Sequence, residues 1–307
     1  MLDHSTLDSL FSTHFDAWGV ARIESIEEEI ARLNEWTNHD YHGEMQYMTR
    51  NIELRANPCE LLPEARSMIM VLMNYYPREW QSDSQPRIAA YAYGNDYHHI
   101  VKSKLTLLAD EINKVSPHKY AVFCDSAPVM ERAWAVRAGL GWIGKNGMLV
   151  NPKLGTFTFI GTLITTLELE PNRPMANRCG RCRKCIEACP TKAILENKTI
   201  DARCCLSYQT IEKRGDIEDE LVDLAGNTLY GCDRCQLACP WNRFAKPHNH
   251  IELNPIEGIF ELDWSTMSRS EFNKRLKFSP MQRAGLKKIK SRYNQIITDN
   301  KPTPKHQ

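Results

Sequence analysis

The stretch NRCGRCRKCIEACPTKAI, from Asn177 to Ile194, decides how the rest of this chain is interpreted. It contains four cysteines with the spacing C-x2-C-x2-C-x3-C, and a proline follows the last of them: Cys179, Cys182, Cys185 and Cys189. Two-residue spacings let three thiolates converge on one cubane [4Fe-4S] cluster, whereas the fourth thiolate points away toward a second cluster. The stretch therefore predicts one complete ligand run and the presence of another.

The second run consists of Cys232, Cys235 and Cys239, followed by Pro240. It lacks the first member of the pattern, because Leu229 stands where that cysteine would be. The adjacent Cys204 and Cys205 lie between the two runs, and either of them can supply the missing thiolate. Cross-ligation then predicts two clusters, one held by Cys179, Cys182, Cys185 and Cys239, the other by Cys189, Cys232, Cys235 and one of Cys204 or Cys205.

The chain has eleven cysteines, which is a high number for a protein expected to lie in the cytoplasm. Thiols stay reduced in that compartment, so metal or cluster ligation is favoured over disulfides. A structural zinc ion is the alternative for a lone C-x2-C pair, but two runs that each end in Cys-Pro favour two [4Fe-4S] clusters. Cys59 and Cys124 remain outside the runs and are expected to pack in the interior.

Composition predicts a globular protein of two or three domains, since the 307 residues are 42% hydrophobic and 25% charged. The chain starts without the basic and apolar segments of a secretory signal and contains no apolar run long enough to cross a membrane, which predicts a cytoplasmic location. The formal net charge is +1, yet the segment from Phe272 to Gln307 has ten Lys or Arg residues and one acid. This basic tail suggests a polyanionic partner; a solvated basic helix is the alternative.

Apolar patterning predicts a mixed α/β region ahead of the cysteines. Strands are expected at Trp18–Ile23, Ser67–Tyr76, Arg87–Tyr93 and Lys119–Phe123, with a pair of strands in Lys153–Leu169. Helices are expected at Leu7–Phe15, Ile26–Trp36, Tyr97–Val115, Pro128–Leu140 and Met281–Ile297, the last with its apolar side inward and its Lys and Arg residues outward. The prolines in Pro171–Arg178 predict a domain boundary and hence three domains, 1–170, 171–250 and 251–307.

Two features of the α/β region have competing interpretations. GLGWIG, Gly139 to Gly144, matches G-x-G-x-x-G, but a dinucleotide site needs a strand before the glycines and a helix after them, the reverse of the order predicted here. These glycines end a helix, and they either let the backbone approach a flat or bulky ligand or form a plain loop. Asp125 follows a predicted strand and precedes a predicted helix, so it is either a helix cap or a catalytic acid.

Several longer segments together resemble the epoxyqueuosine reductase family, from about Trp18 to Phe244: YHGEMQYMTRNIELRANPCELLPEARSMIMVLMNY, YAYGNDYHH, CDSAPVMERAWAVRAGLGWIGKN, DARCCLSYQTIE and LYGCDRCQLACPWNR. The resemblance implies an α/β (α+β) N-terminal cobalamin-binding domain similar to that of reductive dehalogenases. A ferredoxin-like domain with two [4Fe-4S] clusters and a short helical C-terminal segment would follow. The implied substrate is epoxyqueuosine at the wobble position of tRNA, which is reduced to queuosine.

The resemblance also implies roles for individual residues. Asp125 is the implied proton donor, for which a partly dry site should raise its pKa. Cys205, rather than Cys204, is the implied cluster ligand, because the family has a cysteine directly before the hydrophobic-Ser-Tyr triplet that is LSY here. The implied cobalamin contacts are Arg50, Lys145, Asn146, Ser207, Asp233 and Arg234.

The expected partners are tRNA carrying epoxyqueuosine and an electron donor of the flavodoxin or ferredoxin type, with the chain itself a monomer. In a tRNA enzyme the basic tail would contact phosphates. Two other functions fit the cysteine runs: a corrinoid iron-sulfur reductase of a small molecule, as in dehalogenases, and a ferredoxin-type electron carrier.

Overall fold

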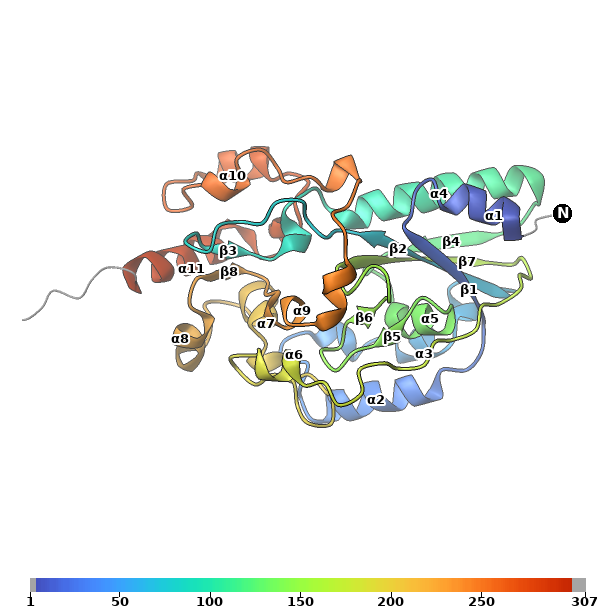
Figure 1. Ribbon diagram of the computed structural model, residues 1–307, viewed down its shortest axis with the longest axis horizontal. Helices are drawn as coiled ribbons and strands as arrows, with labels where there is room; N and C mark the ends of the chain where they lie inside the picture. Colours follow the sequence, from blue (N-terminus) through green and yellow to red (C-terminus); the bar gives the residue numbers. More distant parts are fainter. Residues whose placement is uncertain (1–3, 300–307) are drawn as a thin grey trace, which may run out of the picture.

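The computed structural model describes residues 4–299 of the chain. A four-stranded sheet in the order β1-β2-β7-β4 forms the centre of the N-terminal half (Figure 1). Each neighbouring pair in this sheet is antiparallel. The strands are Ala17–Arg22 (β1), Ser67–Asn74 (β2), Tyr120–Phe123 (β4) and Thr158–Thr165 (β7).

Helices cover both faces of this sheet, which explains the continuous apolar run of β2. All eight residues of β2 are buried. Since successive side chains of a strand point to opposite faces, Ile69 and Val71 pack in one core and Met68 and Met70 in another. The first core includes residues of α1 (His4–Phe11) and α4 (Tyr97–Val115), and the second includes residues of α5 (Glu131–Arg137). Below the sheet in Figure 1 lie also α2 (Glu27–Asn38) and α3 (Ile52–Ala56).

Three expected elements differ from the structure. The strand expected at Arg87–Tyr93 is only Arg87–Ile88 (β3), because the Ala90 N–H donates to the Asp233 carboxylate at 2.7 Å and the chain turns there. Lys153–Leu169 contains one strand, Thr158–Thr165 (β7), since the Asn151 side chain accepts the N–H groups of Lys153 and Leu154 and forms a turn there. The helix expected from Pro128 begins at Glu131, so Pro128 is not in its first turn.

The glycines of GLGWIG serve close approach between backbone segments of the protein. Gly139 has φ +73°, and a Cβ there would lie 2.7 Å from the carbonyl oxygen of Arg173. A Cβ on Gly141 would overlap the carbonyl oxygen of Val150. The short strands Trp142–Ile143 (β5) and Leu149–Val150 (β6) form a hairpin directly after these glycines. The close approach of other backbone segments therefore explains why glycine is needed at these positions, and no ligand is required to explain it.

The cysteine-rich region joins the N-terminal half through a second sheet. Its strand Thr228–Tyr230 (β8) pairs in parallel with β3. The helices of this region are short: Lys184–Glu187 (α6), Leu206–Ile211 (α7), Val222–Ala225 (α8) and Arg234–Leu237 (α9). Leu229, which stands in place of a cysteine, is buried in the core with the N-terminal residues.

The C-terminal segment packs on the same core. It contains Arg269–Arg275 (α10) and Gly285–Asp299 (α11), and α11 lies beside β8 (Figure 1). Met281, Ile289 and Ile296 are buried in the core that also holds the side chains of α4. Because this core extends into all three expected domains, the division at 170 and 250 stays a prediction.

The amphipathic helix expected at the C-terminus is confirmed, with one correction. Ile289 and Ile296 face inward, and Leu286 and Tyr293 pack against the same core. Arg292 was expected to point outward, but it is buried, and its Nε donates to the carbonyl oxygen of Thr228 at 3.0 Å. Carbonyls at the start of β8 attract the guanidinium inward. The described part of the chain contains no helix with the length and apolar character that crossing a membrane requires.

Candidate active site

The first group of thiols consists of Cys179, Cys182, Cys185 and Cys239. Helices α6 and α9, which carry or adjoin these residues, pack against each other. Burial raises the pKa of Cys185, and the nearby thiolates of Cys239, Cys179 and Cys182 raise it further. Burial and the thiolates of Cys179 and Cys182 likewise raise the pKa of Cys239. The fold therefore brings the fourth thiol, from the second cysteine run, to the first three.

The second group of thiols consists of Cys189, Cys205, Cys232 and Cys235. Burial raises the pKa of Cys232 to about 11, with a contribution from Cys205. Burial raises the pKa of Cys235 well above its ordinary value, with contributions from Cys232, Cys205 and Cys189. Burial raises the pKa of Cys204; Asp201 and Arg203 are its strongest charged neighbours, and Cys189 is the thiol of the second group that contributes to the shift. Of these two adjacent cysteines, Cys205 is thus the one whose charge raises the pKa values of Cys232 and Cys235.

Each group has the number of thiols that one [4Fe-4S] cluster requires. All eight thiols are partly exposed. Within residues 4–299, no three His, Cys, Asp or Glu side chains converge closely enough to hold a single metal ion. Thiolates that raise one another's pKa are stabilised when iron neutralises their charge, and four thiolates are the usual ligand set of one [4Fe-4S] cluster.

Lys145 and Asn146 connect the β5–β6 hairpin to both ligand loops. The ammonium of Lys145 donates to the carbonyl oxygens of Gly180 at 3.0 Å and Cys182 at 2.7 Å. The Asn146 amide donates to the carbonyl oxygen of Cys235 at 3.4 Å. Both side chains therefore hold the backbone around the two groups of thiols.

Asp233 and Arg234 stabilise the second ligand loop. The Asp233 carboxylate accepts the Ala90 N–H at 2.7 Å and a hydrogen bond from Gln236 at 3.1 Å. Burial raises the pKa of Asp233 to about 6. The Arg234 guanidinium donates to the carbonyl oxygens of Leu224 at 2.8 Å and Ala225 at 2.9 Å, at the end of α8.

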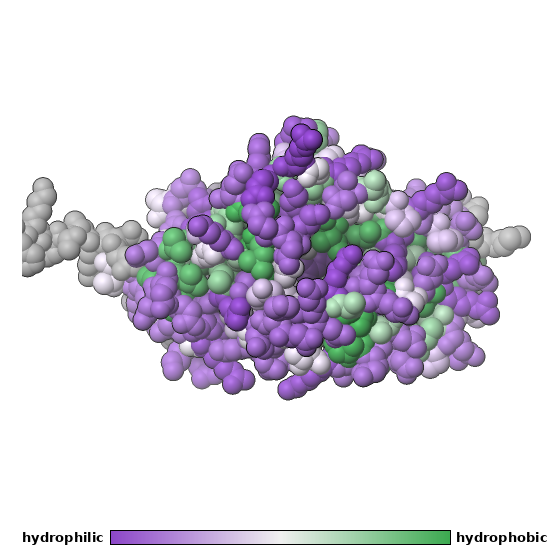
Figure 2. Space-filling model, turned by 90° about the horizontal axis from the view of Figure 1, so that it is seen from below, coloured by the Kyte–Doolittle hydropathy of each residue, from purple (hydrophilic) through white to green (hydrophobic). Residues whose placement is uncertain are grey.

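Arg50 and Ser207 lie on segments that hydrogen bonds hold together. Arg50 is exposed, and Ser207 is partly exposed in α7. The next residue of α7, Tyr208, accepts the N–H of Glu44 on its hydroxyl at 2.8 Å. The residues expected to contact cobalamin thus come from separate segments, and hydrogen bonds join the segments of Asn146, Ser207 and Asp233 where the α/β half meets the cysteine-rich region. Seen from below, the surface of the molecule is largely hydrophilic, with apolar patches and a hollow near its centre (Figure 2).

Asp125 lies directly after β4 and is not a helix cap. Its backbone has φ +54°, a left-handed conformation that Asp tolerates better than most residues. Its N–H donates to both carboxylate oxygens of Glu131 at 3.0 Å, while Met130 precedes α5 without a side-chain cap. The side chain of Asp125 is 64% exposed. Its carboxylate accepts a 2.6 Å hydrogen bond from the hydroxyl of Tyr97.

His98 provides the positive charge beside Asp125. Its Nε2 is 3.7 Å from Asp125, and its Nδ1 is 2.6 Å from Asp96. Burial lowers the pKa of His98, but hydrogen bonds to Asp125 and Asp96 outweigh burial and raise it to about 9. His98 is therefore protonated at neutral pH.

The pKa of Asp125 is shifted in the direction opposite to the one expected. The surrounding protein partly desolvates this otherwise exposed carboxyl and raises its pKa, but hydrogen bonds from His98 and Tyr97 outweigh this effect and lower the pKa below the ordinary value. The expectation of a raised pKa is therefore wrong for the free protein, because a cation and a hydroxyl stabilise the carboxylate more than desolvation destabilises it.

Glu131 is a second acid at this site, one that sequence reasoning did not identify. Burial raises its pKa to about 8, and the charge of Asp125 adds to the shift. It is therefore mostly protonated at neutral pH. Asp96, Tyr97 and His98 were also missed, although they occur together as DYH in a segment that carries the family resemblance.

The C-terminal segment reaches this site through Arg283. The Arg283 guanidinium pairs with both carboxylate oxygens of Glu212, at 3.1 and 2.8 Å, and lies 5.7 Å from the ring centre of Tyr47. Tyr47 is 44% exposed. Burial raises the pKa of Tyr47 to about 12, and the charges of Glu212 and Asp125 contribute. Tyr47 and Arg283 therefore flank the surface next to Asp125.

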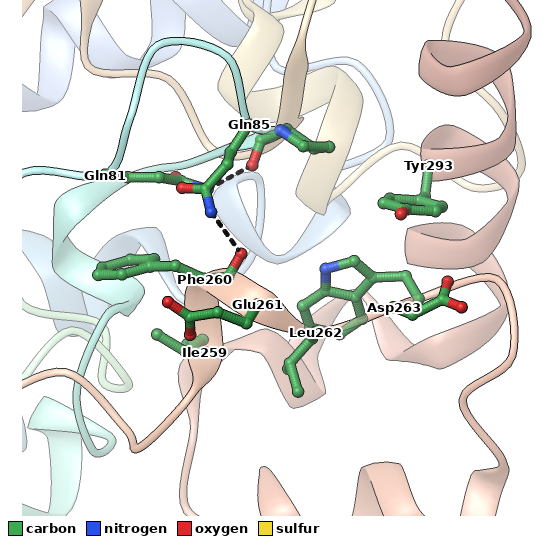
Figure 3. Close-up of a pocket in the computed structure, with 10 residues that line it drawn as sticks. Gln81, Gln85, Ile259, Phe260, Glu261, Leu262, Asp263 and Tyr293 are labelled. Atoms are coloured by element: carbon green, nitrogen blue, oxygen red, sulfur yellow. Dashed lines mark hydrogen bonds between the residues drawn. The ribbon is translucent and has the colours of Figure 1, made fainter.

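Two pockets lie elsewhere. One, of about 200 Å³, is lined by Gln81, Phe260 and Tyr293, and Gln85 donates across it to the carbonyl oxygen of Phe260 (Figure 3). The other, of about 320 Å³, has residues of the second ligand loop in its wall. Asp125 lines neither pocket.

Comparisons with known families match two parts of the chain. Residues 178–242 match the family described as 4Fe-4S double cluster binding domain, a range that contains both groups of thiols. Residues 55–126 match the family described as epoxyqueuosine reductase QueG, DUF1730, a range that includes Asp125.

Individual proteins match nearly the whole chain. The epoxyqueuosine reductase of Leadbetterella byssophila is 42% identical over 278 residues, which is 90% of this chain and 92% of that protein. The epoxyqueuosine reductase of Cyclobacterium marinum is 43% identical over 276 residues, 88% of each chain. A crystal structure of epoxyqueuosine reductase with a tRNA-Tyr epoxyqueuosine-modified tRNA stem loop superposes with a TM-score of 0.85 at 29% identity, over 95% of this chain and 79% of that one. The expected likeness to reductive dehalogenases stays a prediction.

Proposed function

The chain belongs to the epoxyqueuosine reductase family, and from this premise we propose how its residues divide the work of the reaction. The enzyme reduces epoxyqueuosine in tRNA to queuosine. Removal of the epoxide oxygen restores a carbon-carbon double bond, consumes two electrons and two protons, and releases water. The protein must therefore deliver electrons and protons to one bound nucleotide.

Two [4Fe-4S] clusters deliver the electrons singly. The first group of thiols, Cys179, Cys182, Cys185 and Cys239, would hold one cluster, and the second group, Cys189, Cys205, Cys232 and Cys235, would hold the other. The mutual effects of these thiols on their pKa values support this crossed assignment. Cys205 is preferred over Cys204 because it acts on both Cys232 and Cys235.

Cobalamin is the cofactor that the family implies beside the clusters. When bound, it supplies a strongly reducing centre that can combine single electrons into a two-electron step. Arg50, Lys145, Asn146, Ser207, Asp233 and Arg234 would border it at the junction of the two regions. Their fit is supported by the number of separate segments that meet there, and by the hydrogen bonds that fix the positions of Lys145, Asn146 and Asp233.

Asp125 would give a proton to the leaving oxygen. Its exposed carboxyl is accessible to a substrate, and a general acid must come within about 3 Å of the atom that it protonates. The low pKa of Asp125 in the free protein is compatible with this role if a proton is stored next to it. His98 at 3.7 Å and the protonated Glu131 both provide such a store.

The C-terminal segment would contribute to tRNA binding. The basic residues Lys274, Arg275, Lys277 and Lys287 are exposed. Cations of this kind bind phosphates and supply a large share of affinity for nucleic acid. A cytoplasmic location and a monomeric state, both expected from the sequence, are part of the proposal.

The test is an anaerobic assay of the reconstituted protein with cobalamin, a reductant and tRNA that carries epoxyqueuosine. We expect queuosine among the nucleosides by mass spectrometry and a stoichiometric signal of protein-bound cobalamin in electron paramagnetic resonance. Bound cobalamin with no tRNA binding would indicate a reductase of small molecules. Assembled clusters with free cobalamin would indicate an electron carrier.

A further inference from the structure

The loop that carries most of the first group of thiols is strongly cationic. From Asn177 to Lys198 the chain has six Lys or Arg residues and two Glu residues. One of the six, Arg183, pairs with Glu196 at 2.7 Å. The remaining cations outnumber the remaining carboxylate, so this part of the surface carries an excess of positive charge.

Three of these cations have a regular relation to the cluster ligands. Arg178, Arg181 and Lys184 directly precede Cys179, Cys182 and Cys185, respectively. All three are exposed. The hydrogen bonds and ion pairs found within residues 4–299 engage none of their side chains. We call Arg178, Arg181 and Lys184 the cationic rim.

The backbone inside this rim is close to solvent. Gly180 has φ +50°, and a Cβ placed on it would meet no atom within 4 Å. Its carbonyl oxygen accepts the ammonium of Lys145, which adds a further positive charge under the loop. A partner that sits on the cationic rim would therefore be separated from the first group of thiols by little more than the ligand loop.

The second group of thiols is less suited to exchange with an external protein. Gln236 of its loop is buried, and Asp233 is partly buried with its carboxylate bonded to the Ala90 N–H. The cation of that loop, Arg234, directs its guanidinium to the carbonyls of Leu224 and Ala225. Contacts link this loop to the catalytic acid: Asp233 accepts the N–H of Ala90, and the ring of the next residue, Tyr91, lies 6.2 Å from the ring of Tyr97. The Tyr97 hydroxyl donates to Asp125 at 2.6 Å.

We propose that the cationic rim is the docking site of an acidic one-electron carrier protein of the flavodoxin or ferredoxin class, an inference that rests on the proposed function. In each encounter the reduced carrier loses one electron and the cluster on the first group of thiols gains it. Two encounters supply the two electrons that, with two protons, convert one epoxide to an alkene and water. Positive charge on this surface steers an acidic carrier to the cluster and raises the rate of encounter.

A tRNA is also a polyanion, but the positions of the cations favour the carrier. Each cation of the rim is adjacent in sequence to a cluster ligand. This position holds a docked carrier close to the cluster, as electron transfer requires, whereas the binding of phosphates does not require cations next to cluster ligands. The substrate nucleotide must reach Asp125, which the contacts of Tyr91 and Tyr97 link to the second ligand loop.

The experiment uses the double variant Arg181→Glu, Lys184→Glu in the reconstituted holoenzyme. Its matched control is Arg22→Glu, Lys114→Glu. Both control residues are exposed. Arg22 is the last residue of β1 and is paired with Ser67, the first residue of β2. Lys114 lies in the last turn of α4. Stopped-flow spectroscopy measures cluster reduction by reduced flavodoxin and, separately, by reduced methyl viologen. Iron content confirms that the clusters are assembled.

We expect the rim variant to slow reduction by flavodoxin about tenfold or more at low salt and to flatten its dependence on ionic strength. Reduction by methyl viologen and the affinity for tRNA should not fall. An equal loss in the control variant would overturn the proposal, because net charge would then be the cause. A loss of tRNA affinity with unchanged flavodoxin kinetics would overturn it in favour of a tRNA contact.

Failure of this proposal can be distinguished from failure of the proposed function. Cluster reduction by flavodoxin is observed without tRNA, whereas queuosine formation with methyl viologen as reductant does not require the carrier to dock. If the rim variant forms queuosine with methyl viologen at the wild-type rate, the catalytic proposal stands whatever the flavodoxin result.

Discussion

The two ligand loops are similar in sequence but differ in how their charged residues are used. In the first loop Arg178, Arg181 and Lys184 point to solvent, whereas in the second Arg234 and Asp233 bond to the protein backbone. The same cysteine spacing can thus be built as a surface loop or as part of an interior contact. This difference is the basis of the proposed direction of electron flow, from the exposed loop toward the loop that contacts the α/β half.

The largest effect that tests this comparison should come from the second group of thiols. We expect Cys205→Ala to lose one cluster, to retain roughly half of the iron and to lose turnover completely, because one of four ligands is removed. The matched control is the adjacent Cys204→Ala, which should retain both clusters. Iron analysis and electron paramagnetic resonance measure the outcome; equal losses in the two variants would contradict the assignment of Cys205.

The next effect concerns the acid that the second loop adjoins. Asp125→Asn should lower the rate of queuosine formation by about 10²- to 10⁴-fold, the usual contribution of general acid catalysis, and should leave both clusters intact. Asn tolerates the left-handed backbone at this position, so the fold should be retained. The exposed Asp219→Asn is the control. A normal single-turnover rate in Asp125→Asn would exclude this residue from the mechanism.

A smaller effect is expected from His98, whose pKa is raised from 6.5 to about 9. Its charged form is present in full below pH 6.5 and is lost as the pH rises through about 9, so its ion pairs stabilise the fold in the lower range only. If His98 supplies protons to Asp125, wild-type turnover should fall on the same basic limb. In His98→Gln, turnover at pH 7 should be about tenfold lower, and the basic limb should move from about pH 9 to about pH 8, where Glu131 loses its proton. An unchanged pH profile of single turnover would contradict this role.

The smallest effect should come from the second cationic surface, at the C-terminus. Truncation of the chain after Pro280 would not test the charge of this surface alone, because it also removes the buried Met281, Ile289 and Ile296 from the core. We expect Lys274→Glu, Lys287→Glu to weaken tRNA binding severalfold and to reduce the slope of log affinity against log salt by about 1 to 2. Flavodoxin kinetics should not change. If this variant slowed cluster reduction instead, the two cationic surfaces would have been assigned the wrong way round.

Much of the fold could be predicted from local patterns. The helix α4 has the bounds predicted from its apolar spacing, and β2 is the buried strand that its continuous apolar run indicates. These patterns record which face of an element is buried, and the apolar spacing that reveals this face lies within a few neighbouring residues of the sequence. The cysteine spacings predicted two groups of thiols for a comparable reason, because tight loops fix the distances between ligands.

Features that depend on distant residues could not be predicted in this way. The strand expected at Arg87–Tyr93 ends early because the carboxylate of Asp233 takes the Ala90 N–H. Arg292 points inward because the carbonyl oxygen of Thr228 lies beneath it. The direction of the pKa shift of Asp125 depends on His98, which α4 brings to the end of β4. In each case the deciding partner is far away in sequence and leaves no local pattern.

The central claim is that electrons enter at the first group of thiols and reach the substrate only through the second. The most direct measurement is electron paramagnetic resonance of Cys205→Ala after mixing with reduced flavodoxin, combined with analysis of tRNA nucleosides from the same sample. The account predicts a reduced cluster on the first group and no queuosine. Queuosine formation in this variant, or a first cluster that flavodoxin cannot reduce, would contradict it.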